Sequence, residues 1–352
     1  MDLSPITDRL GDLPTAALLG LVTGIFFGVA AQRSAFCLRA ATVEFSRRRL
    51  GPRMAVWLLA FSSAVIWVQA GWLFGLMDTN TARMMAVTGS VSGAIIGGLI
   101  FGAGMVLARG CPGRLLVLAA TGNLRSILSG LLFAVTAQMT LYGWLAGARL
   151  ELAQLWTTPG GRNVDLSVAL GLPGWSALAV GLICAAFALF LARRNRIAPG
   201  ILIFGAGVGV TVAIGYFLTF SLSQIAFDPV TVTSVTFTGP SANTLMAMLV
   251  PFDGWSFDLG LVPGVFIGSF LAAWAGGALR FEGFESAGQT RRAMVGAVMM
   301  GFGGMLAGGC SIGNGLSGTS VMALTAWVAL FSMWIGGMAT DRLIDQRGGE
   351  AV

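Results

Sequence analysis

The feature that most constrains this chain is a series of long apolar segments, each close to the length that crosses a lipid bilayer. A spanning helix needs about 20 mostly apolar residues. Such segments occur at 14–32, 54–76, 89–108, 126–147, 172–192, 199–221, 260–279, 293–308 and 318–338. We therefore predict an all-α polytopic membrane protein with about nine transmembrane helices. The stretch 222–258, which contains TVTSVTFTGPSANTL, is predicted to be a long polar or partly re-entrant loop.

The composition supports a membrane protein and excludes several other classes. Of the 352 residues 56% are hydrophobic and only 10% are charged, and the mean hydropathy is +0.82. Because a soluble domain carries about 25% charged residues, this chain could not cover its own surface in water. The 51 glycines fit closely packed membrane helices. A soluble enzyme, a nucleic-acid-binding protein and a disordered protein are all excluded, and residues 1–352 are expected to form a single transmembrane domain.

The distribution of basic residues predicts the orientation in the membrane. All 21 are arginines, and most follow the first, third, fifth, seventh and ninth segments: Arg39, Arg47, Arg48, Arg49, Arg53, Arg114, Arg125, Arg193, Arg194, Arg196, Arg280, Arg291, Arg292, Arg342 and Arg347. The opposite loops contain only Arg9, Arg83, Arg149 and Arg162. Since cytoplasmic loops carry the excess of positive charge, we predict a periplasmic N-terminus and a cytoplasmic C-terminus. The high pI of 10.1 then reflects topology and not nucleic-acid binding.

Two segments ending in cysteine resemble each other. Residues 96–111 (IGGLIFGAGMVLARGC) and 295–310 (VGAVMMGFGGMLAGGC) are identical at seven of sixteen positions without gaps. The predicted topology makes the two segments run in opposite directions, which is the signature of an inverted repeat in transporters. The repeat halves are expected at roughly 14–150 and 199–338, with a linker helix at about 172–192.

Each copy is followed by residues that interrupt a helix. The sequences are GCPGR around Cys111 and GGCSIGNGLSG around Cys310, and Gly110 and Gly309 directly precede the cysteines. Short broken helices at matching positions of two halves mark a substrate site, and the amides of a restarting helix suit an anion. The alternative is close packing of helices through small residues, which explains the glycines but not the paired cysteines.

The other two cysteines have different surroundings. Cys37 lies in QRSAFCLRA between Arg33 and Arg39, and these cations would attract an anion or would simply be interfacial arginines beside a buried cysteine. A shift by the repeat offset places Cys37 on Thr236, so the second half has lost this thiol. Cys184 lies in the apolar run GLICAAFALF and is expected only to pack. No CxxC pair and no histidine occur, so no metal site or cofactor is predicted.

Three motifs resemble the YeeE/YedE family of bacterial sulfur-compound transporters. They are FCLR around Cys37, GAGMVLARGCPGR around Cys111 and GFGGMLAGGCSIGNGLSG around Cys310, and GSFLAA at 268–273 also fits. The resemblance implies a pseudo-twofold helical fold with re-entrant cysteine-bearing loops that approach the centre from both faces. It implies thiosulfate uptake across the bacterial inner membrane, with functional cysteines at Cys37, Cys111 and Cys310. It also implies a TusA-like sulfur carrier protein as a cytoplasmic partner.

The chemistry of thiosulfate suits such residues. A thiol offers S–H to the soft terminal sulfur, while backbone amides and Asn314 offer N–H to the oxygens. Weak contacts of this kind would let three thiols pass the ion along. Three alternatives remain: transport of a related selenium or sulfur oxyanion, a membrane sulfurtransferase that forms a cysteine persulfide, and transport of an unrelated solute with packing cysteines. No nucleotide-binding loop or catalytic domain is found, so the chain is not expected to be an enzyme.

Overall fold

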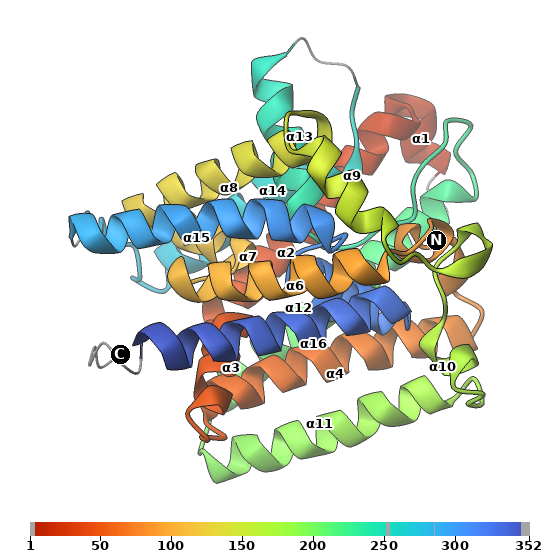
Figure 1. The fold of residues 1–352 in the computed structure, drawn as a ribbon. Coiled ribbons are helices and arrows are strands. Elements are labelled where there is room, and N and C mark those ends of the chain that lie inside the picture. The colour runs from red at the N-terminus through yellow and green to blue at the C-terminus, as the bar shows by residue number, and fades with distance from the viewer. Residues whose placement is uncertain (1–3, 251–253, 285, 346–352) are drawn as a thin grey trace.

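The protein is a bundle of long helices lying roughly side by side (Figure 1). It is described here from a computed structural model, in which residues 4–250, 254–284 and 286–345 are placed. Within these ranges the chain is helical, with isolated β-bridges but no β-strand. The predicted all-helical fold is therefore confirmed.

Each predicted apolar segment overlaps one long helix. These helices are α2 (Asp12–Ser34), α4 (Pro52–Leu73), α6 (Val91–Leu107), α8 (Leu124–Tyr142), α11 (Ser176–Arg194), α12 (Pro199–Ser223), α14 (Phe257–Ala275), α15 (Ala287–Leu306) and α16 (Leu324–Thr340). Shorter elements connect them: α1 (Ser4–Leu10), α3 (Leu38–Ser46), η1 (Thr79–Thr81), α5 (Arg83–Ala86), α7 (Pro112–Ala120), α9 (Ala146–Gln154), η2 (Pro159–Gly161), α10 (Leu166–Ala169), α13 (Thr238–Leu249), η3 (Gly313–Gly318) and η4 (Asp341–Asp345).

Seven helical segments of the described chain are long and apolar enough to cross a membrane. They are Asp12–Ser46, Pro52–Leu73, Val91–Ala120, Leu124–Tyr142, Ser176–Arg194, Pro199–Ser223 and Phe257–Ala275. The predicted eighth and ninth segments are not among them, because α15 carries Arg291 and Arg292 and α16 has only 17 residues. The structure thus establishes a multi-helical protein suited to a membrane, and nine spans remain a prediction.

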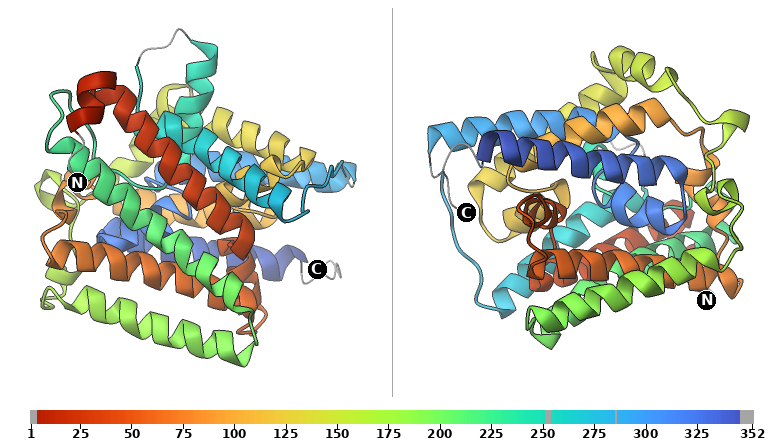
Figure 2. Two further views of the ribbon diagram at one scale, coloured as in Figure 1. Left: turned by 180° about the vertical axis from the view of Figure 1, so that it is seen from behind. Right: turned by 60° about the horizontal axis from the view of Figure 1, so that its bottom comes forward.

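The two ends of the bundle differ in the elements they carry. One end, which we call the α9 face, bears α1, α5, α9 and α10 (Figure 1). The other, the α3 face, bears α3, the 195–198 turn and the end of α16 near the C-terminus, as the two views of Figure 2 also show. The site described below lies between these faces.

Glycines bring the helices of the bundle into close contact. Gly20, Gly24 and Gly28 of α2 lie against the backbone of α14, and a Cβ at any of them would overlap it. Where α6 crosses α15, Gly97 similarly meets the backbone at Gly303. Small residues at four-residue spacing allow such close approach in membranes. Several of the repeated glycines therefore serve close helix packing, which was the alternative considered for them in the sequence analysis.

The packing of the bundle recurs after a shift of 199 residues, the separation of Cys111 and Cys310. Helix α2 packs on α14, and the elements one shift away, α12 and α4, also pack together. In the same way α6 packs on α16 while α15 packs on α8, and α7 packs on α8 while η3 packs on α16. These three pairs of contacts therefore correspond to one another across the shift of 199 residues.

The stretch 222–258 contains more structure than a polar loop. Helix α13 occupies Thr238–Leu249, although its sequence begins with TGP. Proline is tolerated there because N–H groups in the first turn of a helix make no intrahelical hydrogen bond. The N–H that proline lacks is therefore not needed at this position. Before α13 the chain runs inward, and the main-chain N–H of Phe237 reaches the sulfur of Cys310 at 3.3 Å.

Candidate functional site: two cysteine loops

The two cysteine loops share one backbone geometry. Arg109 and Gly308 occupy equivalent positions in left-handed conformation, with φ of 56° and 77°. The next residues close the turn, since the Gly110 N–H donates to the Met105 carbonyl at 3.1 Å and the Gly309 N–H donates to the Gly304 carbonyl at 2.9 Å. This is the pattern that ends a helix through a left-handed residue. Both helices therefore stop directly before their cysteines, as the sequence predicted.

The sulfur atoms of Cys37 and Cys111 lie together. Their side chains are within hydrogen-bonding contact, and the Ser311 side chain contacts Cys111 from the second loop. Cys111 is fully buried and Cys37 nearly so. The structure thus brings together two of the three cysteines selected from the sequence, although 74 residues of chain separate them.

Cys310 lies among neutral donors. Its sulfur accepts hydrogen bonds from the main-chain N–H groups of Phe237 and Gly313, both at 3.3 Å, and the Thr236 hydroxyl is 3.9 Å away. Thr236 is the residue that the repeat offset pairs with Cys37. The structure therefore sets Thr236 beside Cys310 in the way that Cys37 is set beside Cys111.

A main-chain amide three residues further along interacts with each of the three sulfurs. Ala40 supplies it for Cys37, Arg114 for Cys111 and Gly313 for Cys310. Cys37 and Cys111 are the N-cap residues of α3 and α7. A helix N-terminus presents N–H groups and partial positive charge, so each thiol lies where a negatively charged ligand would be stabilised.

A cavity rich in arginine opens from Cys37 toward the α3 face. Its volume is about 580 Å³, and Cys37 and Leu118 are among the side chains that line it. Six arginines and one carboxylate also line it: Arg39, Arg47, Arg49, Arg53, Arg109, Arg114 and Glu44. We call it the arginine cavity. Its charge makes it suited to an anion and unsuited to a cation.

Arg114 is a site residue that the sequence analysis used only as a topology marker. Its charge acts on Cys37 and Cys111, and its Nη1 is buried without a hydrogen-bond partner among the described residues. A buried, unpaired guanidinium nitrogen is costly, which marks a position where an anion would bind. Its position three residues after Cys111, in GCPGR, was the sequence signal that could have identified it as a candidate site residue.

Two other predicted residues lie differently from expectation. Arg33 is exposed and its guanidinium lies beside Gly276 at the end of α14, outside the arginine cavity, whereas Arg39 lines it. Asn314 was expected to offer N–H groups to an anion. Its Nδ2 instead donates to the carbonyls of Ala307 and Gly309, at 3.1 and 2.8 Å. Asn314 therefore holds the second loop, because Gly309 leaves room for it, and only its buried Oδ1 has no partner.

Apolar side chains pack where the two loops meet. Gly113, at the start of α7, lies against Ile312 and Phe237, and the Phe237 ring packs on Phe27 with centroids 5.4 Å apart. All three apolar side chains are buried. Cys310 and the Cys37–Cys111 pair are thus in adjoining loops, with these buried apolar side chains packed at the junction. Cys184 is remote from both, half-buried on α11.

Comparison with known proteins identifies the family of this chain. Residues 33–339 match the family model described as sulphur transport. The chain is 28% identical over 348 residues to the thiosulfate transporter TsuA of Escherichia coli, covering 93% of this chain and 94% of that protein. It is 26% identical over 349 residues to the thiosulfate transporter TsuA of Spirochaeta thermophila, covering 93% and 99%. The family match spans most of the chain and includes all three loop cysteines, so this protein belongs to the sulphur transport family, as its motifs predicted.

Proposed function

We propose that this protein takes up thiosulfate into the cytoplasm across the bacterial inner membrane. Both relatives above carry the name thiosulfate transporter and align along nearly their whole length. The observation that carries the proposal is the meeting of Cys37 and Cys111 at the inner end of the arginine cavity, with Cys310 in the adjoining loop. A soft sulfur donor set beside concentrated positive charge matches an anion with one soft sulfur and three hard oxygens.

We propose a nine-span inverted repeat, with α15 and α16 as the last two spans. The packing that recurs after 199 residues supports the repeat, and the pairing of Cys37 with Cys111 and Thr236 with Cys310 fits it. In this arrangement the cysteine-bearing loops are re-entrant. The α3 face is cytoplasmic because it carries the arginine cavity and most arginine-rich turns, so the α9 face and the N-terminus are periplasmic.

We propose that the ion passes from Cys310 to Cys111 and then to Cys37. Each thiol donates S–H to the terminal sulfur while neighbouring N–H groups hold the oxygens, and no contact is strong enough to trap the ion. Passage requires Phe237 and Ile312 to move, because they close the gap between the loops. The ion leaves through the arginine cavity, where a TusA-like carrier would receive the sulfur.

A membrane sulfurtransferase is the second candidate, favoured by the arginines beside Cys37 and Cys111. In that reaction a cysteine thiolate attacks the sulfane sulfur of thiosulfate, the S–S bond breaks, and sulfite leaves with its electron pair, which yields a persulfide. A protein working in this way gains 32 Da per modified cysteine after exposure to thiosulfate. The transporter proposed here keeps its intact mass unchanged.

Growth of a sulfur auxotroph with this protein as the only uptake route tests the proposed function. We expect growth on thiosulfate but not on sulfate, with the Cys184→Ser variant as a matched control that also grows. Uptake of labelled selenite and sulfite by the same cells measures the preference among related oxyanions. Growth on sulfate but not on thiosulfate would refute the proposal.

A further inference from the structure

Arg83 presents an exposed charge on the α9 face. It begins α5, where its main-chain N–H donates to the carbonyl of Val232 at 2.9 Å and so ties this helix to the chain leading to Cys310. Its side chain is exposed, and its guanidinium makes no hydrogen bond or ion pair with any residue that the structure describes. The backbone is therefore fixed while the charged group faces open space.

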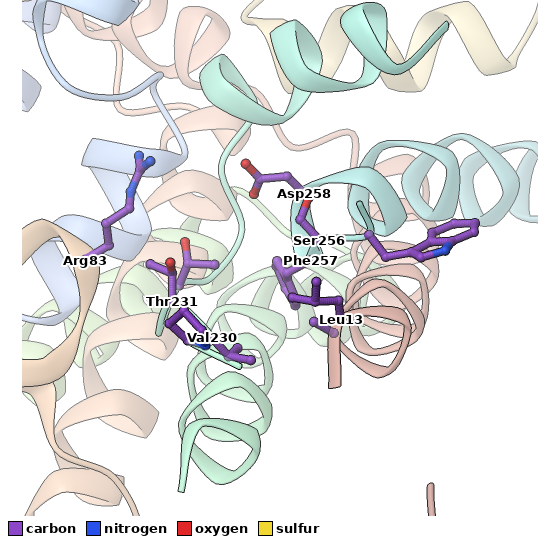
Figure 3. Close-up of a pocket in the computed structure, with 11 residues that line it drawn as sticks. Leu13, Arg83, Val230, Thr231, Ser256, Phe257 and Asp258 are labelled. Atoms are coloured by element: carbon purple, nitrogen blue, oxygen red, sulfur yellow. The ribbon is translucent and has the colours of Figure 1, made fainter. Parts of the chain in front are cut away.

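Three cavities meet at Arg83. The first, of about 150 Å³, extends toward Leu13 and Asp258, and Figure 3 shows the Arg83 and Asp258 side chains on its opposite sides. The second, of about 300 Å³, extends to Arg149 of α9. The third is a gap of about 10 Å³ that reaches Thr236 and Gly313. Arg83 thus lines all three of these cavities, one of which reaches the residues that contact Cys310.

The gap borders two residues that contact Cys310. Thr236 and Gly313 line its inner end, and both contact the Cys310 sulfur. A volume of about 10 Å³ holds at most one water molecule, so the gap is too narrow for thiosulfate in this state. An anion that reaches this gap from the α9 face would therefore be held outside it, beside Arg83, which lines the gap.

Asp258 is the carboxylate that opposes Arg83. It lies in the first turn of α14, and its Oδ2 accepts a hydrogen bond from the Asn243 side chain at 3.0 Å. It does not pair with Arg83, so neither charge cancels the other by contact. An anion between them is attracted by Arg83 and repelled by Asp258, and this places it on the Arg83 side, next to the gap. Neutralising the two residues should therefore change anion affinity in opposite directions.

We infer that Arg83 captures the anion at the outer end of the path and delivers it to Cys310, while Asp258 weakens this binding so that the ion can move on. The inference rests on the proposed function and extends it to a site that the sequence motifs do not include. The ligand is a small divalent oxyanion with a terminal sulfur, the same ion that the thiols carry.

Initial-rate uptake of labelled thiosulfate tests the inference. Arg83→Gln should raise the KM at least tenfold with a smaller change in maximal rate, because loss of a charged hydrogen bond costs about 1.5–3 kcal/mol. Arg83→Lys should keep most of the affinity, and Asp258→Asn should lower the KM. The matched control is Arg162→Gln, since the Arg162 guanidinium on the same face donates to the Asn80 carbonyl.

The outcomes distinguish a failure of the inference about Arg83 from a failure of the proposed function. If Arg83→Gln and Arg162→Gln share the wild-type KM at matched expression, the inference is wrong and the proposed function stands. If the wild-type protein takes up no thiosulfate, the proposed function itself fails. Unfolding midpoints of the purified variants in detergent identify any loss of uptake that comes from misfolding. If Arg83→Gln misfolds, the KM of Arg83→Lys tests the inference instead.

Discussion

The two cysteine loops have the same backbone and different surroundings. Each follows a helix that ends through a left-handed residue, and each sulfur meets the amide three residues on. Cys111 then has a second thiol and Arg114 beside it, whereas Cys310 has a threonine and two amides. The two loops therefore share the geometry that presents sulfur and differ in the charge around it.

The difference indicates separate tasks for the two loops. In the function proposed above, the neutral donors around Cys310 would bind an oxyanion weakly, and the arginines beyond Cys37 would bind it more strongly. Movement from the first set to the second would then draw the anion inward. Replacing one neighbour of each loop tests this comparison.

The largest effect among the neighbours is expected at Arg114. Arg114→Gln removes a charge beside two thiols and should reduce uptake about 10- to 100-fold, from the 1.5–3 kcal/mol of a charged hydrogen bond. Thr236→Val removes a neutral hydroxyl beside Cys310 and should reduce uptake only about two- to tenfold. Labelled uptake at matched expression compares them. A larger loss in Thr236→Val would reverse the assignment of tasks.

A smaller effect, on thermal stability, is expected from the side chain that holds the second loop and has no equivalent in the first. Asn314 holds the second loop through two hydrogen bonds, while the first loop has Leu115 at the equivalent position. Asn314→Leu leaves two buried carbonyls without a donor, which costs about 1–3 kcal/mol each. Thermal unfolding in detergent should show a lower midpoint than for Asn80→Ala, an exposed control. Equal midpoints would mean that Asn314 does not hold the loop.

Much of the fold follows from the sequence because bilayer length and glycine spacing are local signals. The apolar segments located the long helices, and the shared Gly-Cys endings located the helix breaks at Cys111 and Cys310. Helix α13 was missed because TGP is typical of a turn, although proline fits a first helical turn.

The site was harder to predict than the fold because its residues meet only after folding. Motifs selected the three cysteines, but nothing local shows that Cys37 faces Cys111 or that Arg33 turns away while Arg114 turns inward. Asn314 has both donor and acceptor groups, so the sequence alone could not show that the loop uses its N–H groups. The repeat offset did pair Cys37 with Thr236. This was the sequence signal that Thr236 would lie beside Cys310 as Cys37 lies beside Cys111.

The most direct test of the central claim is uptake of labelled thiosulfate by purified protein in proteoliposomes. Serine is nearly the size of cysteine, but its hard hydroxyl is a poor partner for soft sulfur. We therefore predict that Cys111→Ser and Cys310→Ser fall to the level of empty vesicles, that Cys37→Ser is weakened or inactive, and that Cys184→Ser stays near wild type. Wild-type uptake by Cys310→Ser together with loss in Cys184→Ser would contradict a path built on the two loops.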